Sequence, residues 1–187
     1  MILTALAMPQ MTIYSLWMIL APFGALAWAI MALGDRLRGV KIEDVDHFSV
    51  KRVVISFIPN LALFGVSIIT PITVGTLFWT GCALLGVSVA IYLLAIGAFV
   101  KARRGVTAIG IYRLSRNPMY VAIFIMLAGL CLMAWQASPL TGLLAVVVSL
   151  WNMGATHWAI LTEERFLSEK YGEDYLSYKR SVRRYLG

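Results

Sequence analysis

Three long stretches without a charged residue alternate with three short charged segments along the chain. The uncharged stretches are residues 1–34, 53–100 and 117–162. The second stretch has 48 residues and, as a single α-helix, would measure about 72 Å at 1.5 Å per residue. The hydrocarbon core of a bilayer is only about 30 Å thick. We therefore expect the second and third stretches each to fold back on themselves.

Proline residues with polar neighbours mark where these two stretches turn. Pro71 lies in Thr70-Pro71-Ile72-Thr73, and Pro139 ends the run Gln136-Ala137-Ser138-Pro139. Proline ends or kinks a helix because it lacks a backbone N–H and its ring clashes with the preceding turn. The pattern predicts five membrane-spanning helices, at about residues 11–33, 53–69, 74–100, 119–135 and 140–161.

The composition agrees with a membrane protein. Hydrophobic residues make up 60% of the chain, charged residues 13%, and the mean hydropathy is +0.82. A soluble domain of 187 residues cannot bury that much apolar surface. The fold class that we expect is all-α, an integral membrane bundle forming a single domain over residues 1–187. Apolar positions at near-helical spacing after Glu164 predict a short cytoplasmic helical tail.

The positive charges predict the orientation of the bundle. All 16 Lys and Arg residues fall in three segments, which lie on one side of the membrane if the N-terminus is outside. Lys and Arg are retained on the cytoplasmic side of membrane proteins, so we expect the charged loops and the C-terminus in the cytoplasm. The net charge of +7 then faces anionic lipid head groups. Because no basic groove with interleaved aromatic residues is visible, we expect no nucleic-acid partner.

The two cysteines give no indication of a metal site. Cys82 and Cys131 each lie inside an apolar stretch, where cysteine behaves as a small hydrophobic residue. No Cys-x-x-Cys or Cys/His cluster is present. The sequence therefore predicts no bound metal.

The first candidate site is the segment Gly110-Ile-Tyr-Arg-Leu-Ser-Arg-Asn-Pro-Met-Tyr120, just before the fourth expected span. Pro118 suits the first position of a helix, and Asn117 before it suits a cap. The N–H groups of a first helical turn can bind a carboxylate or phosphate, and Arg116 would add a bidentate anion donor. The alternative is a simple helix cap with Arg and Tyr anchored at the interface.

The second candidate site is Glu163-Glu164, at the end of the fifth expected span. Two adjacent carboxylates there repel each other and face the negative end of the helix dipole. They either form a solvated helix end or hold a cation such as a ligand amine. Farther up the helix, His157 shares a face with Glu164, and it could line a cavity or join helices by hydrogen bonds.

The two sites together predict a pocket for a zwitterion. An anion-binding helix start and a carboxylate pair would lie at the same ends of two adjacent antiparallel helices. That arrangement suits a ligand with an amino-acid moiety. S-adenosylmethionine is one such ligand, although the charges alone do not single it out.

The same motifs resemble the isoprenylcysteine carboxyl methyltransferase family. The motif ending at Tyr120, the pair Glu163-Glu164 and the run Tyr171-Gly-Glu-Asp-Tyr175-Leu-Ser-Tyr178 occur in the order of that family, with a helical hairpin between the first two. The similarity covers about residues 107–185. The family belongs to a wider group of membrane methyltransferases that includes phospholipid N-methyltransferases.

The resemblance implies a membrane-embedded methyltransferase that binds S-adenosylmethionine at the cytoplasmic face, with residues 107–187 forming the cofactor-binding part. The substrate would be lipophilic or lipid-modified, entering from the bilayer. Glu164 and His157 are the catalytic candidates, as proton acceptors for an amine or thiol substrate. By position in the family pattern, the cofactor would be bound by Tyr112, Arg116, Asn117, Pro118, Tyr120, Glu163 and Glu164.

Several functions fit this sequence. The isoprenylcysteine carboxyl methyltransferase activity comes first, followed by phospholipid N-methylation and S-methylation of small thiols. Asn117 stands where eukaryotic members of the family have His, and Asn cannot act as a base at neutral pH. A non-catalytic subunit or a transporter is the alternative from another class. A transporter would place polar residues near the middle of the bilayer, whereas here polar residues concentrate at the cytoplasmic ends.

Overall fold

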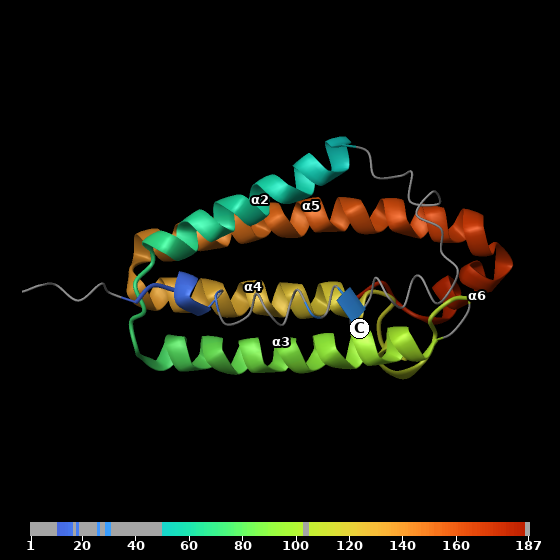
Figure 1. Ribbon diagram of the computed structural model, residues 1–187, viewed down its shortest axis with the longest axis horizontal. Coiled ribbons are helices and arrows are strands. Elements are labelled where there is room, and N and C mark those ends of the chain that lie inside the picture. The colour runs from blue at the N-terminus through green and yellow to red at the C-terminus, as the bar shows by residue number, and fades with distance from the viewer. Residues whose placement is uncertain are drawn as a thin grey trace, which may run out of the picture.

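The computed structural model is a bundle of long helices packed side by side, and the short helix α6 lies at one end (Figure 1). The description covers residues 11–16, 18, 26, 29–30, 50–102 and 105–185, with side chains in the first helix below described from Ile58 onward. The elements in chain order are α2 (Val50–Ile69), α3 (Thr76–Lys101), the 3-10 helix η2 (Gly110–Arg113), α4 (Pro118–Ala137), α5 (Pro139–Tyr171) and α6 (Glu173–Ser181).

Three of these helices are long and apolar enough to cross a membrane. They are α3, α4 and α5, and they correspond to the predicted spans 74–100, 119–135 and 140–161. The predicted span 53–69 coincides with α2, whose stretch Ile58–Ile69 is apolar but shorter. The predicted span 11–33 lies mostly outside the described residues. The number of five spans and their orientation therefore stay predictions.

The chain turns at both predicted prolines. Helix α2 ends at Ile69, and Pro71 lies in the connection to α3, where it bridges to Thr12. Helix α5 begins at Pro139, and the hydroxyl of Ser138 accepts a hydrogen bond from the Thr141 N–H at 3.1 Å. This hydrogen bond satisfies one of the backbone donors that a helix start leaves unpaired. Both breaks are confirmed.

Pro59 shows that proline alone does not predict a break. It lies inside α2, and the helix continues through it. Its ring is fully buried. A polar neighbour does not distinguish the three prolines, because Asn60 follows Pro59 as Thr70 precedes Pro71 and Ser138 precedes Pro139.

Helix α5 is longer than the sequence pattern predicts. It runs without interruption for 33 residues, about 50 Å at 1.5 Å per residue, and ends at Tyr171 instead of near residue 161. Gly172, with φ of 53°, ends the helix, and its N–H donates to the Ser168 carbonyl at 3.0 Å. Glu163 and Glu164 therefore lie on the side of a projecting helix.

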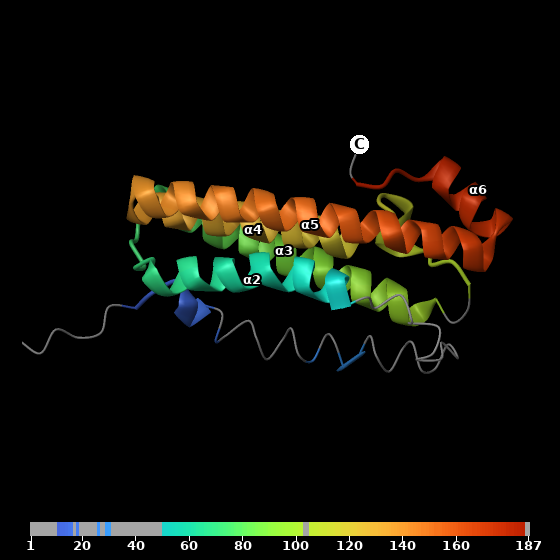
Figure 2. The same cartoon turned by 90° about the horizontal axis from the view of Figure 1, so that it is seen from above.

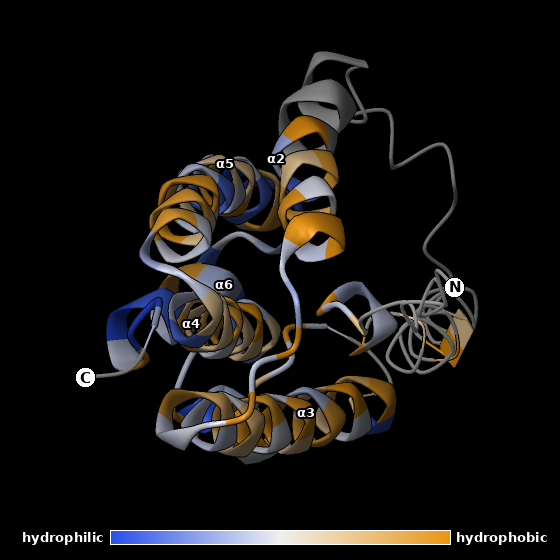
Figure 3. Cartoon of the chain, turned by 90° about the vertical axis from the view of Figure 1, so that its left-hand side faces the viewer, coloured by the Kyte–Doolittle hydropathy of each residue, from blue (hydrophilic) through white to orange (hydrophobic). Residues whose placement is uncertain are grey.

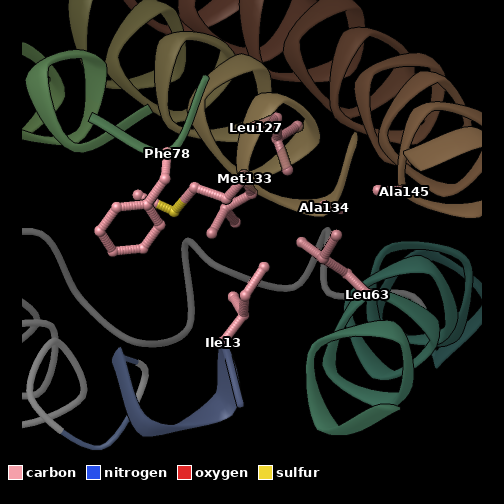
Figure 4. Close-up of a cluster of buried hydrophobic side chains, with 8 residues drawn as sticks. Ile13, Leu63, Phe78, Leu127, Met133, Ala134 and Ala145 are labelled. Atoms are coloured by element: carbon pink, nitrogen blue, oxygen red, sulfur yellow. The ribbon is translucent and has the colours of Figure 1, made fainter. Parts of the chain in front are cut away.

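The apolar core lies toward the end of the bundle where the chain makes its proline turns. Buried side chains from every long helix meet there, and Figure 4 shows them pointing into a shared interior. Helices α3 and α4 approach closely at two glycines. A Cβ built on Gly81 would lie 2.7 Å from the Gly129 carbonyl oxygen, so no larger residue fits without movement. Small residues at helix crossings are typical of membrane bundles.

Apolar side chains also cover the outside of the bundle. Trp79, Leu94 and Leu150 are each more than 60% exposed, as are several other large hydrophobic residues. Seen end-on, hydrophobic colouring dominates α3 and α4, and hydrophilic colouring is strongest around α6 (Figure 3). An apolar exterior of this extent is suited to a lipid surrounding.

Candidate functional site

A cavity of about 430 Å³ opens at the end of the bundle opposite the proline turns. Helices α3, α4 and α5 form its walls, and η2 and α6 close its outer end. The volume lies within the roughly 300–1,000 Å³ typical of small-molecule pockets. All seven residues that were predicted to bind a cofactor line it: Tyr112, Arg116, Asn117, Pro118, Tyr120, Glu163 and Glu164.

The short helix η2 places Tyr112 in the wall of the cavity. Tyr112 is buried and packs with Ala95 and Ala98 near the end of α3. Its carbonyl oxygen accepts a hydrogen bond from the Tyr178 hydroxyl of α6 at 2.7 Å. Tyr112 thereby joins η2 to α3 by packing and to α6 by a hydrogen bond, around the cavity.

The start of α4 differs from the sequence interpretation in one detail. Pro118 is the first helical residue and Asn117 occupies the cap position, as expected, but the Asn117 side chain makes no capping hydrogen bond. Instead, its Nδ2 donates to the Arg184 carbonyl at 3.3 Å. The Ser115 hydroxyl donates to the same carbonyl at 3.1 Å and accepts from the Asn117 N–H, also at 3.1 Å. The predicted side-chain cap is therefore wrong, since the amide holds the C-terminal segment.

Arg116 is the buried cation of the site. Its side chain is 7% exposed, and its Nη2 lies 3.3 Å from Oε1 of Glu164. Its Nε and Nη1 are buried without a hydrogen-bond partner among the described residues. Buried polar groups are nearly always hydrogen-bonded, because a missing partner destabilises the fold. Since Arg116 lines the cavity, these two N–H groups are suited to an anionic ligand.

Glu164 is the centre of an ion-pair cluster. Its side chain is 4% exposed, and Arg184 donates to both of its oxygens at 2.9 Å. Lys179 Nζ lies 3.7 Å from Oε2, in addition to the contact with Arg116. Three positive side chains thus converge on one carboxylate and leave an excess of positive charge. The hydrogen bond to Glu164 raises the pKa of the Arg184 guanidinium.

Glu163 has different surroundings from Glu164, although the two are adjacent. Successive residues on a helix point about 100° apart. Glu163 is exposed at the cavity, and its Oε2 accepts a hydrogen bond from the Tyr120 hydroxyl at 3.0 Å. It is the carboxylate of the pair that a ligand can reach.

Tyrosines are concentrated around the cavity. Six of the eight in the chain line it: Tyr92, Tyr112, Tyr120, Tyr171, Tyr175 and Tyr178. Burial raises the pKa of Tyr175 to about 12 and also raises that of Tyr178. The phenols of α6 therefore remain neutral at physiological pH. Their π faces attract cations, including the sulfonium or ammonium groups of ligands.

His157 and the polar residues above it are not part of the cavity lining. His157 Nδ1 lies 2.7 Å from the Tyr185 hydroxyl, and the Tyr185 ring also contacts Phe124. The Thr156 hydroxyl donates to Oδ1 of buried Asn152 at 3.4 Å. Of the three α5 residues predicted for the site, Glu163 and Glu164 line the cavity and His157 does not.

Four contributors to the site were missed by sequence reasoning. Ser115, Lys179, Arg184 and Tyr185 all contact predicted site residues. In the sequence, Lys179 and Arg184 look like further basic residues facing lipid head groups. The turn at Gly172 brings α6 with Lys179 back to Glu164, and the return of the chain after α6 brings Arg184 there (Figure 2).

Comparison with known proteins places the site within a family domain. The profile of the phospholipid methyltransferase family matches residues 96–174, from the end of α3 to the start of α6. This segment is a domain of the membrane methyltransferase group, and the protein is an S-adenosylmethionine-dependent methyltransferase. The resemblance seen in the sequence is confirmed for that group, while isoprenylcysteine specificity stays a prediction. No curated protein and no solved structure matched the chain.

Proposed function

We propose that the protein methylates the amine head group of a membrane lipid, using S-adenosylmethionine bound in the cavity. One observation carries this proposal: Arg116 presents two buried nitrogens, Nε and Nη1, that have no hydrogen-bond partner among the described residues, to a cavity that Glu163 also lines. A buried cation and a reachable carboxylate in the same pocket suit the amino-acid moiety of the cofactor.

The residues present fit the cofactor. Arg116 would bind its carboxylate, Glu163 would bind its amine, and the tyrosines would face its adenine and sulfonium. Asn117 and Pro118 would shape the adjacent wall. The cofactor-binding part, for which the sequence predicts residues 107–187, would also include Tyr92 and Phe99 of α3 because both line the cavity. When bound, S-adenosylmethionine supplies an electrophilic methyl group and leaves as S-adenosylhomocysteine.

An amine acceptor must lose a proton before its lone pair can take the methyl group. The sequence predicts Glu164 or His157 as the proton acceptor. We favour Glu163, because it is exposed at the cavity, where its Oε2 accepts a hydrogen bond from the neutral Tyr120 hydroxyl. Glu164 is a poor base, because the positive charges of Arg116, Arg184 and Lys179 favour its ionised form. His157 would need to act from outside the lining.

The shape of the cavity supports a lipophilic substrate. The lining extends along α3 to Tyr92, nine residues or roughly 14 Å before the end of that helix at Lys101. It therefore extends from the charged end into the apolar part of the bundle. The matched family also acts on phospholipids by its description. With the positive-inside rule, we place the charged end at the cytoplasmic face.

Methylation of a prenylated cysteine carboxylate is the second candidate. The observation that favours it is again Arg116, whose Nε and Nη1, unbonded within the described ranges, could bind a substrate carboxylate instead of the cofactor. A carboxylate acceptor needs no base, so this activity would not require Glu163 as a proton acceptor. Both candidates need Glu163 for cofactor binding, so they differ in whether Glu163→Gln still transfers the methyl group at saturating cofactor.

Calorimetry with the purified protein in lipid nanodiscs tests the cofactor site. We expect wild type to bind S-adenosylmethionine, and Glu163→Gln to weaken binding by about tenfold, the effect of one charge-assisted hydrogen bond. Glu173→Gln is the matched control, since Glu173 pairs with Arg180 on the exposed face of α6. Absence of binding by folded wild type, or equal loss in both variants, would contradict the proposed pocket.

A transfer assay then identifies the acceptor. Wild type is incubated with radiolabelled S-adenosylmethionine and either ethanolamine phospholipid vesicles or a farnesylated cysteine in neutral vesicles. We expect label in the ethanolamine phospholipid, with transfer lost in Glu163→Gln even at saturating cofactor. Label only in the farnesylated cysteine would establish the second candidate.

A further inference from the structure

We propose that Arg184 is a positioning residue, which keeps Arg116 available for the carboxylate of the cofactor. The inference rests on the proposed function of the cavity. Arg184 belongs to the C-terminal strap, the segment 182–185 that follows α6 and returns to the start of α4 (Figure 1). The strap has no role in the family match, which ends at residue 174.

Backbone contacts fix the strap against the segment that carries Arg116. The Arg116 N–H donates to the Arg183 carbonyl at 2.9 Å. The Arg184 carbonyl accepts from both Ser115 and Asn117. The residues on either side of Arg116 are therefore bonded to the strap, and its backbone is fixed on both sides.

Side-chain contacts explain why Nε and Nη1 of Arg116 have no hydrogen-bond partner among the described residues. Among the residues that the structure describes, its only ionic partner is Glu164, and Arg184 already donates to both oxygens of that carboxylate at 2.9 Å. Arg116 approaches the same carboxylate at 3.3 Å through Nη2 alone. A bidentate pair is the preferred geometry of Arg with a carboxylate. Arg184 takes that geometry and leaves Nε and Nη1 of Arg116 directed elsewhere.

The loss of Arg184 would then change the site in a definite way. Glu164 would keep Arg116 and Lys179 as partners, and Arg116 would be drawn into the vacant bidentate geometry. Its N–H groups would bind the protein's own carboxylate and be less available to a ligand. The substitution also removes one positive charge beside Glu164, but the specific effect is on the binding of a ligand carboxylate by Arg116.

The test compares two ligands that differ in the amino-acid moiety. S-adenosylhomocysteine carries the carboxylate, whereas 5′-methylthioadenosine lacks it. We expect Arg184→Gln to weaken binding of S-adenosylhomocysteine by about tenfold and to leave 5′-methylthioadenosine within about twofold, since only one charge-assisted contact is affected. Arg184→Lys should not restore binding, because Lys cannot make a bidentate pair. In turnover, KM for the cofactor should rise while kcat changes little.

Arg180→Gln is the matched control, because it removes the same charge from a side chain that pairs with Glu173 on the exposed face of α6. A merely structural role of Arg184 would weaken both ligands equally, and that result would overturn the inference. So would equal affinities of Arg184→Gln and Arg180→Gln for S-adenosylhomocysteine. Failure of wild type to bind either ligand would instead contradict the proposed cofactor pocket.

Discussion

The two ends of the helix bundle are built from different side chains. The end with the proline turns is filled by buried apolar residues and by the contact of Gly81 with Gly129. The opposite end holds a cavity, a carboxylate bound by three cations, and two guanidinium nitrogens without a partner in the described part of the chain. Apolar packing at the first end stabilises the fold. At the second end, polar groups that lack hydrogen-bond partners among the described residues can bind a ligand.

The difference shows how a small membrane protein can stabilise its fold at one end of a helix bundle and bind a ligand at the other. Helices α3, α4 and α5 run through both ends, so the packed end fixes the directions of the cavity walls. Substitutions at the packed end should change stability and leave ligand affinity in the folded protein. Substitutions in the cavity should lower ligand affinity and leave stability nearly unchanged. Glu164 is the exception, because it both holds the ion-pair cluster together and lines the cavity.

The largest effect that we expect is from Glu164→Gln. It leaves Arg116, Arg184 and Lys179 without their shared carboxylate, and breaking a buried ion pair destabilises by about 3–5 kcal/mol. Thermal unfolding in detergent measures the loss, and cofactor affinity should fall with it. Glu169→Gln, an exposed acid on the same helix, is the control. An unchanged melting temperature for Glu164→Gln would show that the cluster does not stabilise the fold.

Arg116→Ala should affect the cavity end selectively. It removes two donors proposed for the cofactor carboxylate, each worth about 1.5–3 kcal/mol as a charge-assisted hydrogen bond, so affinity should fall by about 100-fold or more. The melting temperature should fall less than in Glu164→Gln, because Glu164 keeps Arg184. Arg113→Ala changes an exposed neighbour and should bind normally. Calorimetry with S-adenosylhomocysteine distinguishes the variants.

Gly81→Ala should affect only the packed end. The added Cβ would lie 2.7 Å from the Gly129 carbonyl oxygen and from Met133 Cγ, and overpacking of this kind destabilises by about 1–3 kcal/mol. Gly86→Ala, on the same helix, is the control because nothing lies within 4 Å of its added Cβ. Alanine favours a helix, so Gly86→Ala should be neutral or slightly stabilising. Equal melting temperatures would exclude the close approach of α3 and α4.

Tyr120→Phe should have the smallest effect. It removes the hydrogen bond to Glu163, which is worth about 1.5–3 kcal/mol at most and less at an exposed carboxylate. We expect a few-fold rise in KM for the cofactor and no change in melting temperature. Initial rates at varied cofactor concentration measure it. Tyr171→Phe offers a comparison within the same lining, and an equal change in both would assign no special role to the Tyr120 hydroxyl.

The sequence predicted the helices better than it predicted the partners of the site residues. Charge-free lengths and Pro71 and Pro139 located four helices, because those signals are local or follow from the thickness of a bilayer. The continuation of α5 to Tyr171 was not predicted, since charged residues after Glu163 suggested an interfacial tail. Their helical propensity and the ion pairs of Glu164 extend the helix instead.

The seven residues predicted to bind the cofactor line one cavity, yet their individual interactions were not foreseen. Glu163 and Glu164 look equivalent in sequence, and a rotation of about 100° gives them different neighbours. Arg184 lies 20 residues beyond Glu164, and its contact depends on the turn at Gly172 and the path of the strap. Such long-range pairings carry no periodic signal in a single sequence.

The unbroken course of α5 sets a fixed distance between the proline turn at Pro139 and the carboxylate of Glu163. Glu163 lies 24 residues after Pro139, which is about 36 Å along a straight helix and a few ångströms more than the hydrocarbon thickness of about 30 Å. If the proline turn sits at one surface of the hydrocarbon, the carboxylate is held at the level of the opposite head groups. The depth of the acceptor group in the bilayer would then select the substrate. Acceptor groups a few ångströms above the acyl chains are methylated, and groups that lie deeper in the bilayer or farther into the water are not.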